Sequence, residues 1–328
     1  MPELPEVESA RIVLESHCLG ARVTTVCVEE SGGGPRHGKR DELVLGEGVE
    51  SSLARGTLRS TGRHGKVMWW CLEGEDAAIT FVSFHFGMTG AFSYKGEAGP
   101  VFKRYSVGST SQFPPKFTKL SLHFSNGVEF AFTDPRRLGR VRRAASVAEI
   151  VKGLGPDALR ELPPPRDFVA LLSSRSCPIK ALLLDQSVLA GIGNYLADEV
   201  LYAAGVHPES SSDAVGGDPV QVADLRGAIE SVVSTACACS ADYTRFPTSW
   251  LFHVRWGKGK DGTTMPNGDK VTWITVGGRT SAVVLAKQGR PVKHSSPGGA
   301  KVGGGVDGGG GKKSCGGKKR ARVLLENN

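Results

Sequence analysis

MPELPEVE, at residues 1–8, places a proline and two glutamates at the start of an apolar pattern typical of a helix. Pro2 is small, so we expect Met1 to be removed, which exposes a secondary amine. An α-amino group has a pKa of roughly 7.7–8, so a fraction of it is uncharged and nucleophilic near neutral pH. Glu3 and Glu6 stand beside this amine and could donate or accept protons. The motif also fits a simple helix start, because the helix dipole favours acidic residues there.

Working outward, the pattern predicts a helix over residues 1–17 that starts after Pro5. Its apolar stripe is formed by Val7, Ala10, Val13 and Leu14. From about 20 to 145, short β-rich runs alternate with Gly, Pro and Ser, which predicts a sandwich or barrel. The stretch 94–116 lacks periodicity and is expected to form a loop.

After Leu154-Gly155-Pro156 the pattern becomes helical. Helices are expected at 167–174, 178–187, 194–204 and 219–236. Residues 250–256 and 270–285 return to strand-like composition around the turn GKGKDGTTMPNGDK, which predicts a hairpin. From about residue 289 the chain is rich in Gly, Lys and Ser, a composition that predicts a disordered tail.

The composition places limits on the class of protein. No apolar run approaches the roughly 18 residues that a membrane span needs, and the start of the chain has no signal-peptide core. We therefore expect an intracellular protein.

The net charge of +8 belongs entirely to residues 287–328, which hold ten basic and two acidic residues. Seven scattered cysteines, with Cys237 and Cys239 as the one close pair, indicate reduced thiols and no zinc site.

Local basic clusters in the rest of the chain are candidates for phosphate contacts. Lys66 follows a basic loop and precedes a predicted strand; it suits a phosphate-facing edge or a solvated charged turn. Five arginines crowd eight positions, at 136, 137, 140, 142 and 143. Met88 and Leu138 suit insertion between bases, although Met88 also suits core packing. In GIGNYLADEVLYAAGVHP (191–208), Asn194 is a good helix N-cap, and amides at a helix N-terminus bind phosphate.

Six blocks, in this order, resemble the formamidopyrimidine-DNA glycosylase/endonuclease VIII family. They are PELPEVE (2–8), GRHGK (62–66), FHFGMTG (84–90), TDPRRLGRV (133–141), IKALLLDQ (179–186) and GIGNYLADEVLYAAGVHP (191–208). The family's members are bifunctional glycosylase–lyases. The resemblance also implies their fold, an α+β multidomain fold. It comprises an N-terminal helix plus β-sandwich domain (1–145), a helix–two-turn–helix domain (155–245), a zincless finger hairpin (250–288) and a disordered basic tail (289–328).

The resemblance also implies roles for individual residues. Pro2 corresponds to the Schiff-base nucleophile, Glu3 to the general acid, and Lys66 to a lysine that contacts phosphate and assists β-elimination; Glu6 joins them as a proton-exchanging carboxylate. DNA-contact roles follow for His85, Met88, Arg136, Leu138, Arg175, Lys180 and Asn194. Met88, Arg136 and Leu138 resemble the wedge that fills the space of an extruded nucleotide, and Asn194 the asparagine that holds the backbone beside the lesion.

Three departures from the family pattern affect the expected function. The C-x2-C pairs of a zinc finger are absent, and WLFHVRWGKGK…DKVTWITVGGRTSAVV instead resembles the zincless finger of plant and fungal members, with Arg279 at its tip. Gly277-Gly278 is expected to form its tight tip, and its rigidity is expected from Trp250, Phe252, Trp256, Trp273, Ile274 and Val276. SADYTRFPTSW (240–250) does not match the flexible loop that closes over 8-oxoguanine, and Leu138 stands where the formamidopyrimidine branch often has Phe.

Together these features predict a glycosylase that excises oxidised bases from damaged double-stranded DNA and then cleaves the abasic strand. We expect no cofactor, no metal, no membrane contact, a monomer and, from the basic tail, a nuclear location. A non-catalytic lesion-sensing protein is the main alternative, although it would not need an N-terminal proline. An RNA-binding helix–two-turn–helix protein would explain 178–208 but leave the N-terminal motif unexplained.

Overall fold

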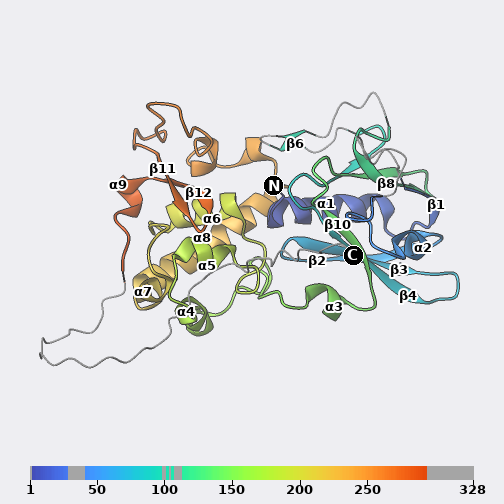
Figure 1. Cartoon of the computed structure of the whole chain (residues 1–328), viewed down its shortest axis with the longest axis horizontal. Helices are drawn as coiled ribbons and strands as arrows, with labels where there is room; N and C mark the ends of the chain where they lie inside the picture. The colour runs from blue at the N-terminus through green and yellow to red at the C-terminus, as the bar shows by residue number, and fades with distance from the viewer. Residues whose placement is uncertain (1, 29–40, 98–100, 103–104, 107–112, 294–328) are drawn as a thin grey trace, which may run out of the picture.

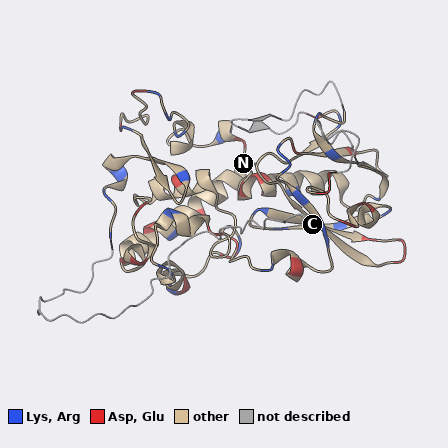
Figure 2. Cartoon of the chain, viewed as in Figure 1, with Lys and Arg blue, Asp and Glu red and all other residues tan. Residues whose placement is uncertain are grey.

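A computed structural model describes residues 2–28, 41–97, 101–102, 105–106 and 113–293. The first half of the chain forms a β-rich part and the second half a helical part, with the start of helix α1 (Leu4–Cys18) between them (Figure 1). Basic and acidic residues are distributed over both parts (Figure 2). Among the described residues, none of the helices has the length and apolar character that crossing a bilayer requires. The predicted α+β class, with an N-terminal helix, a β-sandwich and a helical C-terminal part, is confirmed.

Two antiparallel four-stranded sheets form the β-rich part, in the orders β1-β8-β9-β5 and β10-β4-β3-β2. Their strands are β1 (Val23–Val28), β2 (Thr57–His64), β3 (Val67–Glu73), β4 (Ile79–His85), β5 (Ala91–Tyr94), β8 (Thr118–Phe124), β9 (Glu129–Thr133) and β10 (Arg140–Ala144). Alternating side chains meet between the sheets, where Trp70, Phe84, Phe92 and Phe130 make edge-to-face and tilted ring contacts. The short helices α2 (Val49–Leu53) and α3 (Val147–Val151) flank this part.

Helix α1 contributes to both hydrophobic cores. Val7, Leu14 and Cys18 are buried in the sandwich core, whereas Leu4 is buried in the core of the helical part. The helix begins at Leu4, earlier than the predicted start after Pro5. Pro5 fits inside the first turn because the backbone amides of that turn have no partner within the helix. The first residues of the chain are thereby fixed at the junction of the two parts.

The helical part consists of α4 (Pro165–Ser173), α5 (Ile179–Leu184), α6 (Asn194–Ala203), α7 (Ser212–Gly216) and α8 (Pro219–Ala238). Four of these were predicted from apolar periodicity, with ends that differ by a few residues; α7 was missed because it is short. Leu182, Leu196, Val200 and Ile229 lie in its core. Helix α6 is buried on nearly every side, so it is a central helix and not an amphipathic surface helix.

Two predictions about strands are wrong. Residues 250–256 form the short 3-10 helix η3 (Leu251–His253) and turns, not a strand. The hairpin turn is not the polar segment before residue 270; it is Gly277-Gly278, the tight tip expected from the sequence, between β11 (Thr272–Val276) and β12 (Arg279–Val283). Both glycines have positive φ (55° and 73°), as a tight two-residue turn requires. The short helix α9 (Leu285–Gln288) follows.

The core of the hairpin also differs from the predicted one. It is formed by Leu251, Met265, Val271, Ala282 and Val284, with Trp273 partly buried against it. Trp250, Phe252 and Trp256 instead pack onto the core of the helical part. Within the segment 94–116, which was expected to form a loop, two short strands pair as a small hairpin, β6 (Val101–Phe102) and β7 (Tyr105–Ser106). The predicted disordered tail lies outside the described residues from 294 onward.

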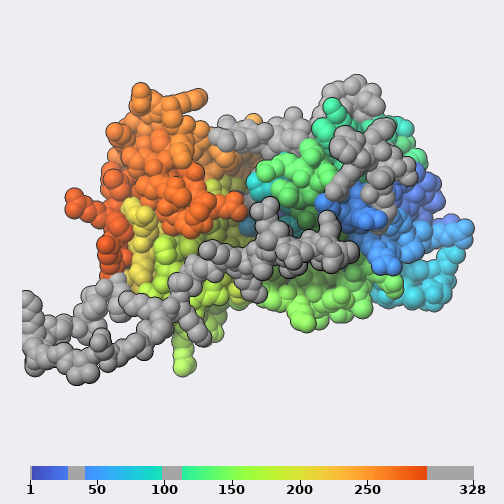
Figure 3. All heavy atoms as spheres, viewed as in Figure 1, coloured from blue at the N-terminus to red at the C-terminus, as the bar shows by residue number. Residues whose placement is uncertain are grey.

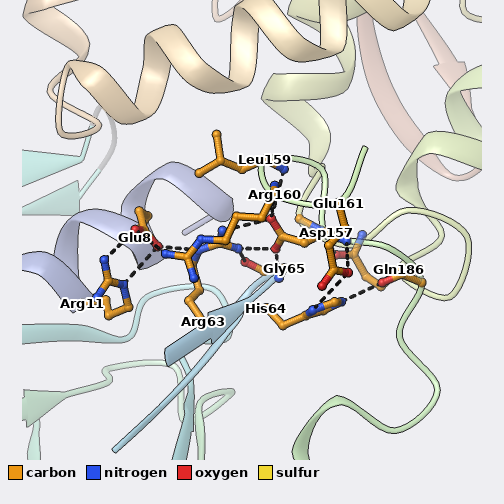
Figure 4. A network of polar contacts seen from close by, with 12 residues as sticks. Glu8, Arg11, Arg63, His64, Gly65, Asp157, Leu159, Arg160, Glu161 and Gln186 are labelled. Carbon is orange, nitrogen blue, oxygen red and sulfur yellow. Dashed lines mark hydrogen bonds and ion pairs between the residues drawn. The ribbon is translucent and has the colours of Figure 1, made fainter. Parts of the chain in front are cut away.

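A buried network of charged groups joins the β-rich part to the segment that leads into the helical part (Figure 4). Arg63, at the end of β2, donates through Nε to Glu8 of α1 (2.7 Å) and through Nη2 to Asp157 (3.0 Å). Asp157 also accepts the amide of Gly65 (2.6 Å). These ions are almost inaccessible to solvent, so each depends on its partners: a buried charge that loses its partner costs about 3–5 kcal/mol.

We expect Glu8 to make the free energy of unfolding sensitive to acid. Hydrogen bonds and charges from Arg11 and Arg63 outweigh burial and lower the pKa of Glu8 from 4.5 to about 2. The stabilisation is therefore complete above pH 4.5 and is lost as the pH falls towards 2. A shift of this size corresponds to roughly 3 kcal/mol. Urea unfolding should show Glu8→Gln less stable than the wild type by about that amount at pH 7, with the gap closing towards pH 3.

Glu15→Gln is the matched control, because Glu15 also pairs with Arg11 on α1 but is partly exposed. Its effect should be about 0.5 kcal/mol, as for other helix-surface pairs. A gap between wild type and Glu8→Gln that stays constant from pH 7 to pH 3 would contradict the assigned role of the Glu8 carboxylate.

Candidate functional site

Pro2 lies buried at a cavity of about 550 Å³ where the two parts of the molecule meet. Helix α1, strand β5 and the turn after α8 form its walls, through residues that include Glu6, Ala10, Phe92, Tyr94 and Tyr243. Most of these side chains are apolar. The outer surface is hollowed between the residues of the C-terminal hairpin and the sandwich (Figure 3). The N-terminal proline therefore lies beside a partly open cavity of the size that ligand pockets have.

The carboxylate of Glu3 caps the N-terminus of helix α6. Its Oε2 accepts the amides of Gly193 (2.8 Å) and Leu196 (3.2 Å), and its Oε1 accepts the amide of Tyr195 (2.9 Å). Glu3 is almost fully buried. An anion at this position is stabilised both by free amides and by the helix dipole. The residue after Pro2 is thus fixed to the helical part by three hydrogen bonds.

Two glycines allow this close approach. A Cβ on Gly193 would lie 2.2 Å from Cδ of Glu3, and a Cβ on Gly191 would lie 2.4 Å from Cδ1 of Leu4. Gly191 also has φ +113°, a conformation that other residues rarely adopt. The glycines of GIGN therefore make room for the start of α1.

Asn194 does not have the predicted N-cap role. Gly193 is the N-cap residue, Glu3 supplies the capping carboxylate, and Asn194 is the first residue of α6. Its Nδ2 donates to the carbonyl of Thr280 in the hairpin (3.1 Å), while its buried Oδ1 has no partner among the described residues. Asn194 therefore connects the start of α6 with the hairpin, close to the Glu3 carboxylate.

Glu6 has a different environment from Glu3. Its Oε2 accepts the amide of Glu3 (2.8 Å), and its Oε1 accepts the hydroxyl of Tyr195 (2.9 Å). Burial, and next the charge of Glu3, raise the pKa of Glu6 to about 7. Glu6 also lines the cavity with Pro2. This carboxyl group can therefore gain or release a proton near neutral pH beside the amine.

Lys66 lies at the same junction, after the Gly65 turn between β2 and β3. Its ammonium donates to the carbonyl of Ile192 (2.8 Å), just before α6. Burial is the largest effect on its pKa and lowers it, and the charge of Arg279 lowers it further, while Glu3 and Glu6 act in the opposite direction. Lys66 is therefore a poorly solvated cation close to both carboxylates.

His85 and Arg279 complete the group around Lys66. Burial, followed by the charges of Lys66 and Arg140, lowers the pKa of His85, so the imidazole is neutral at pH 7. Its Nδ1 accepts the amide of Gly87 (3.2 Å), which leaves the proton on Nε2. Arg279 is exposed at the start of β12, directly after the Gly277-Gly278 turn. Of the predicted site residues, Pro2, Glu3, Glu6, Lys66, His85 and Arg279 thus lie together.

A second cluster forms around the buried Asp134, at one end of the sandwich. Its Oδ1 accepts the hydroxyl of Thr89 (2.7 Å) and its Oδ2 the amide of Gly139 (2.6 Å). These bonds hold the turn that carries Arg136 and Leu138 against the turn that carries Met88. Arg136 and Leu138 are exposed, and Met88 is half-buried. The three predicted wedge residues are therefore neighbours, displayed by a rigid support.

Most of the arginine cluster at 136–143 has a structural role, which corrects its interpretation as a DNA surface. Arg137 is paired with Asp41. Arg142 donates to the carbonyls of Val44 (2.7 Å) and Leu43 (3.0 Å), and Arg140 to that of Gly139 (2.6 Å). These guanidinium groups satisfy backbone carbonyls and a buried carboxylate. Their density in the sequence reflects the packing of residues 41–46 on β10.

Neither Lys180 nor Arg175 lines the cavity beside Pro2. Lys180 is fully buried and binds Asp198 (2.6 Å), the hydroxyl of Ser281 (2.6 Å) and the carbonyl of Thr280 (3.1 Å). It cannot reach a phosphate in this structure, so its predicted role in DNA contact is wrong here. Arg175 is half-exposed and paired with Asp185.

Two acidic residues on α6 that position the hairpin were not predicted from the sequence. Asp198 binds Lys180 and Arg255 (both 2.6 Å). Glu199 accepts the amides of Leu251 (3.1 Å) and Phe252 (2.8 Å), and burial raises its pKa to about 8. A signal was present, because two adjacent acids in an otherwise apolar helix must be buried and therefore must be paired. Tyr195 and Asp134 were also missed.

The described part of the chain contains no cluster of three or more His, Cys, Asp or Glu residues placed to hold a metal ion. Its cysteines are free thiols, and Cys237 and Cys239 lie at the end of α8, away from the hairpin. Within the part of the chain that the structure describes, the hairpin is held by its small apolar core and by Asp198 and Glu199.

Comparisons with known proteins match nearly the whole described chain. Residues 1–141 match the family model of the formamidopyrimidine-DNA glycosylase N-terminal domain, and residues 154–248 match that of the formamidopyrimidine-DNA glycosylase H2TH domain. A formamidopyrimidine-DNA glycosylase of Arabidopsis thaliana is 37% identical over 286 residues, 87% of this chain and 70% of the relative. A protein of the same name from Acidiphilium cryptum is 31% identical, over 75% of this chain and 80% of the relative.

Solved structures have the same fold. The Thermus thermophilus MutM (Fpg) protein superposes with a TM-score of 0.66 at 26% identity, covering 88% of this chain and 99% of its own. Lactococcus lactis Fpg in complex with DNA that contains an abasic site superposes with a TM-score of 0.68 at 21% identity, covering 88% and 100%.

We expect Gly193→Ala to destabilise the protein, because the new Cβ would occupy the space of the Glu3 carboxylate. Displacing it breaks three charge-assisted hydrogen bonds, and each is worth about 1.5–3 kcal/mol. With partial relaxation, the free energy of unfolding should fall by roughly 3 kcal/mol. Gly227→Ala on α8 is the matched control: its Cβ would meet nothing within 4 Å, so it should stabilise by about 0.5–1 kcal/mol. Equal urea midpoints for Gly193→Ala and the wild type would contradict this account of Gly193.

Proposed function

We propose, because this chain belongs to the formamidopyrimidine-DNA glycosylase family, that it excises oxidised bases from double-stranded DNA and then cleaves the abasic strand. The observation that carries the proposal is the position of Pro2. This residue lies beside a cavity, next to the buried carboxylate of Glu3, the partly buried carboxyl group of Glu6 and a partly desolvated lysine. Formamidopyrimidines are the expected substrates, and the expected place of the protein is in base excision repair.

In the proposed first step, the uncharged secondary amine of Pro2 attacks C1′ of the damaged nucleotide. A bond forms between the proline nitrogen and C1′, and the bond between C1′ and the base breaks. The base leaves with the electron pair and takes up a proton. The proline nitrogen then loses its proton while the bond from C1′ to the ring oxygen opens, and that oxygen gains a proton. The product is an iminium ion, the electron sink for the next step.

In the proposed lyase step, a base removes a proton from C2′ of the iminium. The electrons of that C–H bond form the C1′=C2′ double bond of an enamine. The nitrogen lone pair then re-forms the iminium, the C1′=C2′ electrons form a C2′=C3′ double bond, and the C3′–O bond breaks as the 3′ phosphate leaves with its electron pair. Glu6 is suited to exchange protons here, because its raised pKa of about 7 lets it act in either direction near neutral pH. Lys66 and Arg279 supply positive charge for the phosphates. Glu3 holds Pro2 in place and is the candidate acid for the base.

The cluster around Asp134 suits the other requirement of this chemistry. A base inside a duplex must be extruded before C1′ can be reached, and the vacated space must be filled. Met88 and Leu138 offer apolar side chains and Arg136 a cation, all on turns fixed by buried hydrogen bonds. We propose that these side chains form the wedge, and that residues 240–244, which line the cavity, face the extruded base.

Several expectations remain predictions alongside this function. They are the monomeric state, the nuclear location and the domain boundaries drawn from the sequence. Preference for formamidopyrimidines over 8-oxoguanine also remains one, since it depends on how residues 240–250 contact the base. The basic tail (289–328) should add salt-dependent affinity for DNA, because each phosphate contact releases counterions, while turnover of the bound complex should barely depend on it.

Covalent trapping tests the proposed nucleophile. Borohydride should reduce the iminium and link the wild-type protein to abasic-site DNA, giving a slow band on a denaturing gel. Protein that retains Met1 has no free proline amine and should lose nearly all of this product, as should Pro2→Gly. Mass spectrometry of each preparation checks the N-terminus. Equal trapping by the Met1-retaining form would exclude Pro2, whereas no trapping by any form would favour a non-catalytic lesion-binding protein.

The hairpin arginine can be tested by Arg279→Ala. Loss of one charge-assisted hydrogen bond to a phosphate should cost about 1.5–3 kcal/mol, which lowers single-turnover excision by about 10- to 150-fold. Arg290→Ala is the matched control, because Arg290 is also exposed but lies beyond the hairpin; it should change the rate less than twofold. A chelator should leave both rates unchanged. Wild-type rates for Arg279→Ala would remove this residue from the site.

A further inference from the structure

Phe117 is a large apolar side chain that the structure holds out of the sandwich. It precedes β8, and 37% of it is exposed to solvent. The next two residues, Thr118 and Lys119, are buried, and Lys119 pairs with Asp41 (3.4 Å). The Phe117 ring is therefore partly exposed directly before the point where the side chains of β8 become buried.

The backbone of Phe117 is in a conformation that a bulky residue disfavours. Its φ is +68°, in the left-handed region that sterically suits glycine. Hydrogen bonds fix this geometry: the carbonyl of Phe117 accepts the amide of Asp134 (3.0 Å), and the amide of Thr118 donates to the carbonyl of Pro115 (3.2 Å). Strain of this kind persists only where the surrounding structure enforces it, and it is concentrated at functional sites.

The same Asp134 organises the turn that carries Arg136 and Leu138. Its backbone amide binds Phe117, and its side chain binds the amide of Gly139, directly after Leu138. Phe117 and Leu138, both exposed apolar residues, are thus attached to one rigid group. Lys116 places its ammonium 5.0 Å from the centre of the Phe117 ring, so a cation accompanies the exposed aromatic face. An aromatic ring with an adjacent cation is suited to contact a base and its phosphate together.

We propose that Phe117 is a second apolar wedge residue, which stacks on a base exposed when the damaged nucleotide leaves the duplex. The inference rests on the proposed function and extends it to a residue outside the family-like blocks. Leu138 is aliphatic and offers little flat surface for stacking, whereas the Phe117 ring supplies it. Stacking of this kind does not depend on which base is present, because every base has a π-face.

A single exposed apolar residue is ordinary on a protein surface, and Ile79 shows the ordinary case. Ile79 is 51% exposed at the start of β4, in normal strand geometry. It has neither the positive φ nor the hydrogen-bonded link to the Asp134 cluster. Ile79→Ala is therefore the matched control for removal of an exposed apolar side chain.

The test compares single-turnover excision from two DNA substrates by the full chain. In one, a formamidopyrimidine is paired opposite cytosine in a duplex; in the other, the same lesion lies in an unpaired bubble, where no base must be separated from its partner. Phe117→Ala should slow excision from the duplex about tenfold and from the bubble less than twofold. Phe117→Trp should retain the duplex rate, and Ile79→Ala should match the wild type on both substrates.

Phe117→Gly separates a DNA contact from a structural role. Glycine accepts φ +68° without strain, so this variant should melt at or above the temperature of Phe117→Ala while losing the same duplex activity. The proposal is overturned if Phe117→Ala excises from the duplex as fast as Ile79→Ala, or if it slows both substrates equally. A wild-type protein inactive on both substrates would instead refute the proposed function, and the inference with it.

Discussion

The contact between the Glu3 carboxylate and the N-terminus of α6 determines the geometry of the rest of the site. It joins residues about 190 positions apart in the sequence and fixes the residue adjacent to Pro2. Gly191 and Gly193 are needed because this approach leaves no room for a side chain. Helix α6 in turn holds the hairpin through Asp198 and Glu199. Through α6, the Glu3 carboxylate therefore links the first residues of the chain to the hairpin that carries Arg279.

On the β-rich side of the junction, buried ion pairs fix the position of Lys66. The Gly65 turn, which leads to Lys66, is held by Asp157, and Asp157 is held by Arg63. Buried ion pairs add little net stability compared with apolar packing, but their hydrogen bonds permit few alternative arrangements. The main contribution of these ion pairs is to position the β2–β3 turn against the loop before α6. Lys66 then contacts Ile192 with little freedom to move.

Local patterns predicted the elements well, because apolar periodicity records which face of each element is buried. The sandwich strands and four helices followed from it, and the order of short motifs identified the family. Contacts between distant segments could not be predicted. Asparagine is a residue type that favours N-caps, but the carboxylate that caps α6 belongs to Glu3, which is distant from Asn194 in the sequence. Lys180 and most of the arginines at 136–143 look like a basic surface in sequence, yet they neutralise carboxylates or satisfy carbonyls that only the folded chain brings near.

The partners of the two carboxyl groups beside Pro2 suggest how proton transfer is divided between them. Every hydrogen bond to the Glu3 carboxylate comes from a backbone amide, which can donate but not accept. A proton on Glu3 would weaken the bonds that position Pro2, because the amides and the helix dipole favour the ionised carboxylate. Glu6 instead faces the hydroxyl of Tyr195, which can accept as well as donate, so Glu6 can be protonated without losing this contact. With its pKa raised to about 7, Glu6 can exchange a proton in the proposed reaction at constant geometry, whereas Glu3, the candidate acid for the base, holds Pro2 less firmly when it carries a proton.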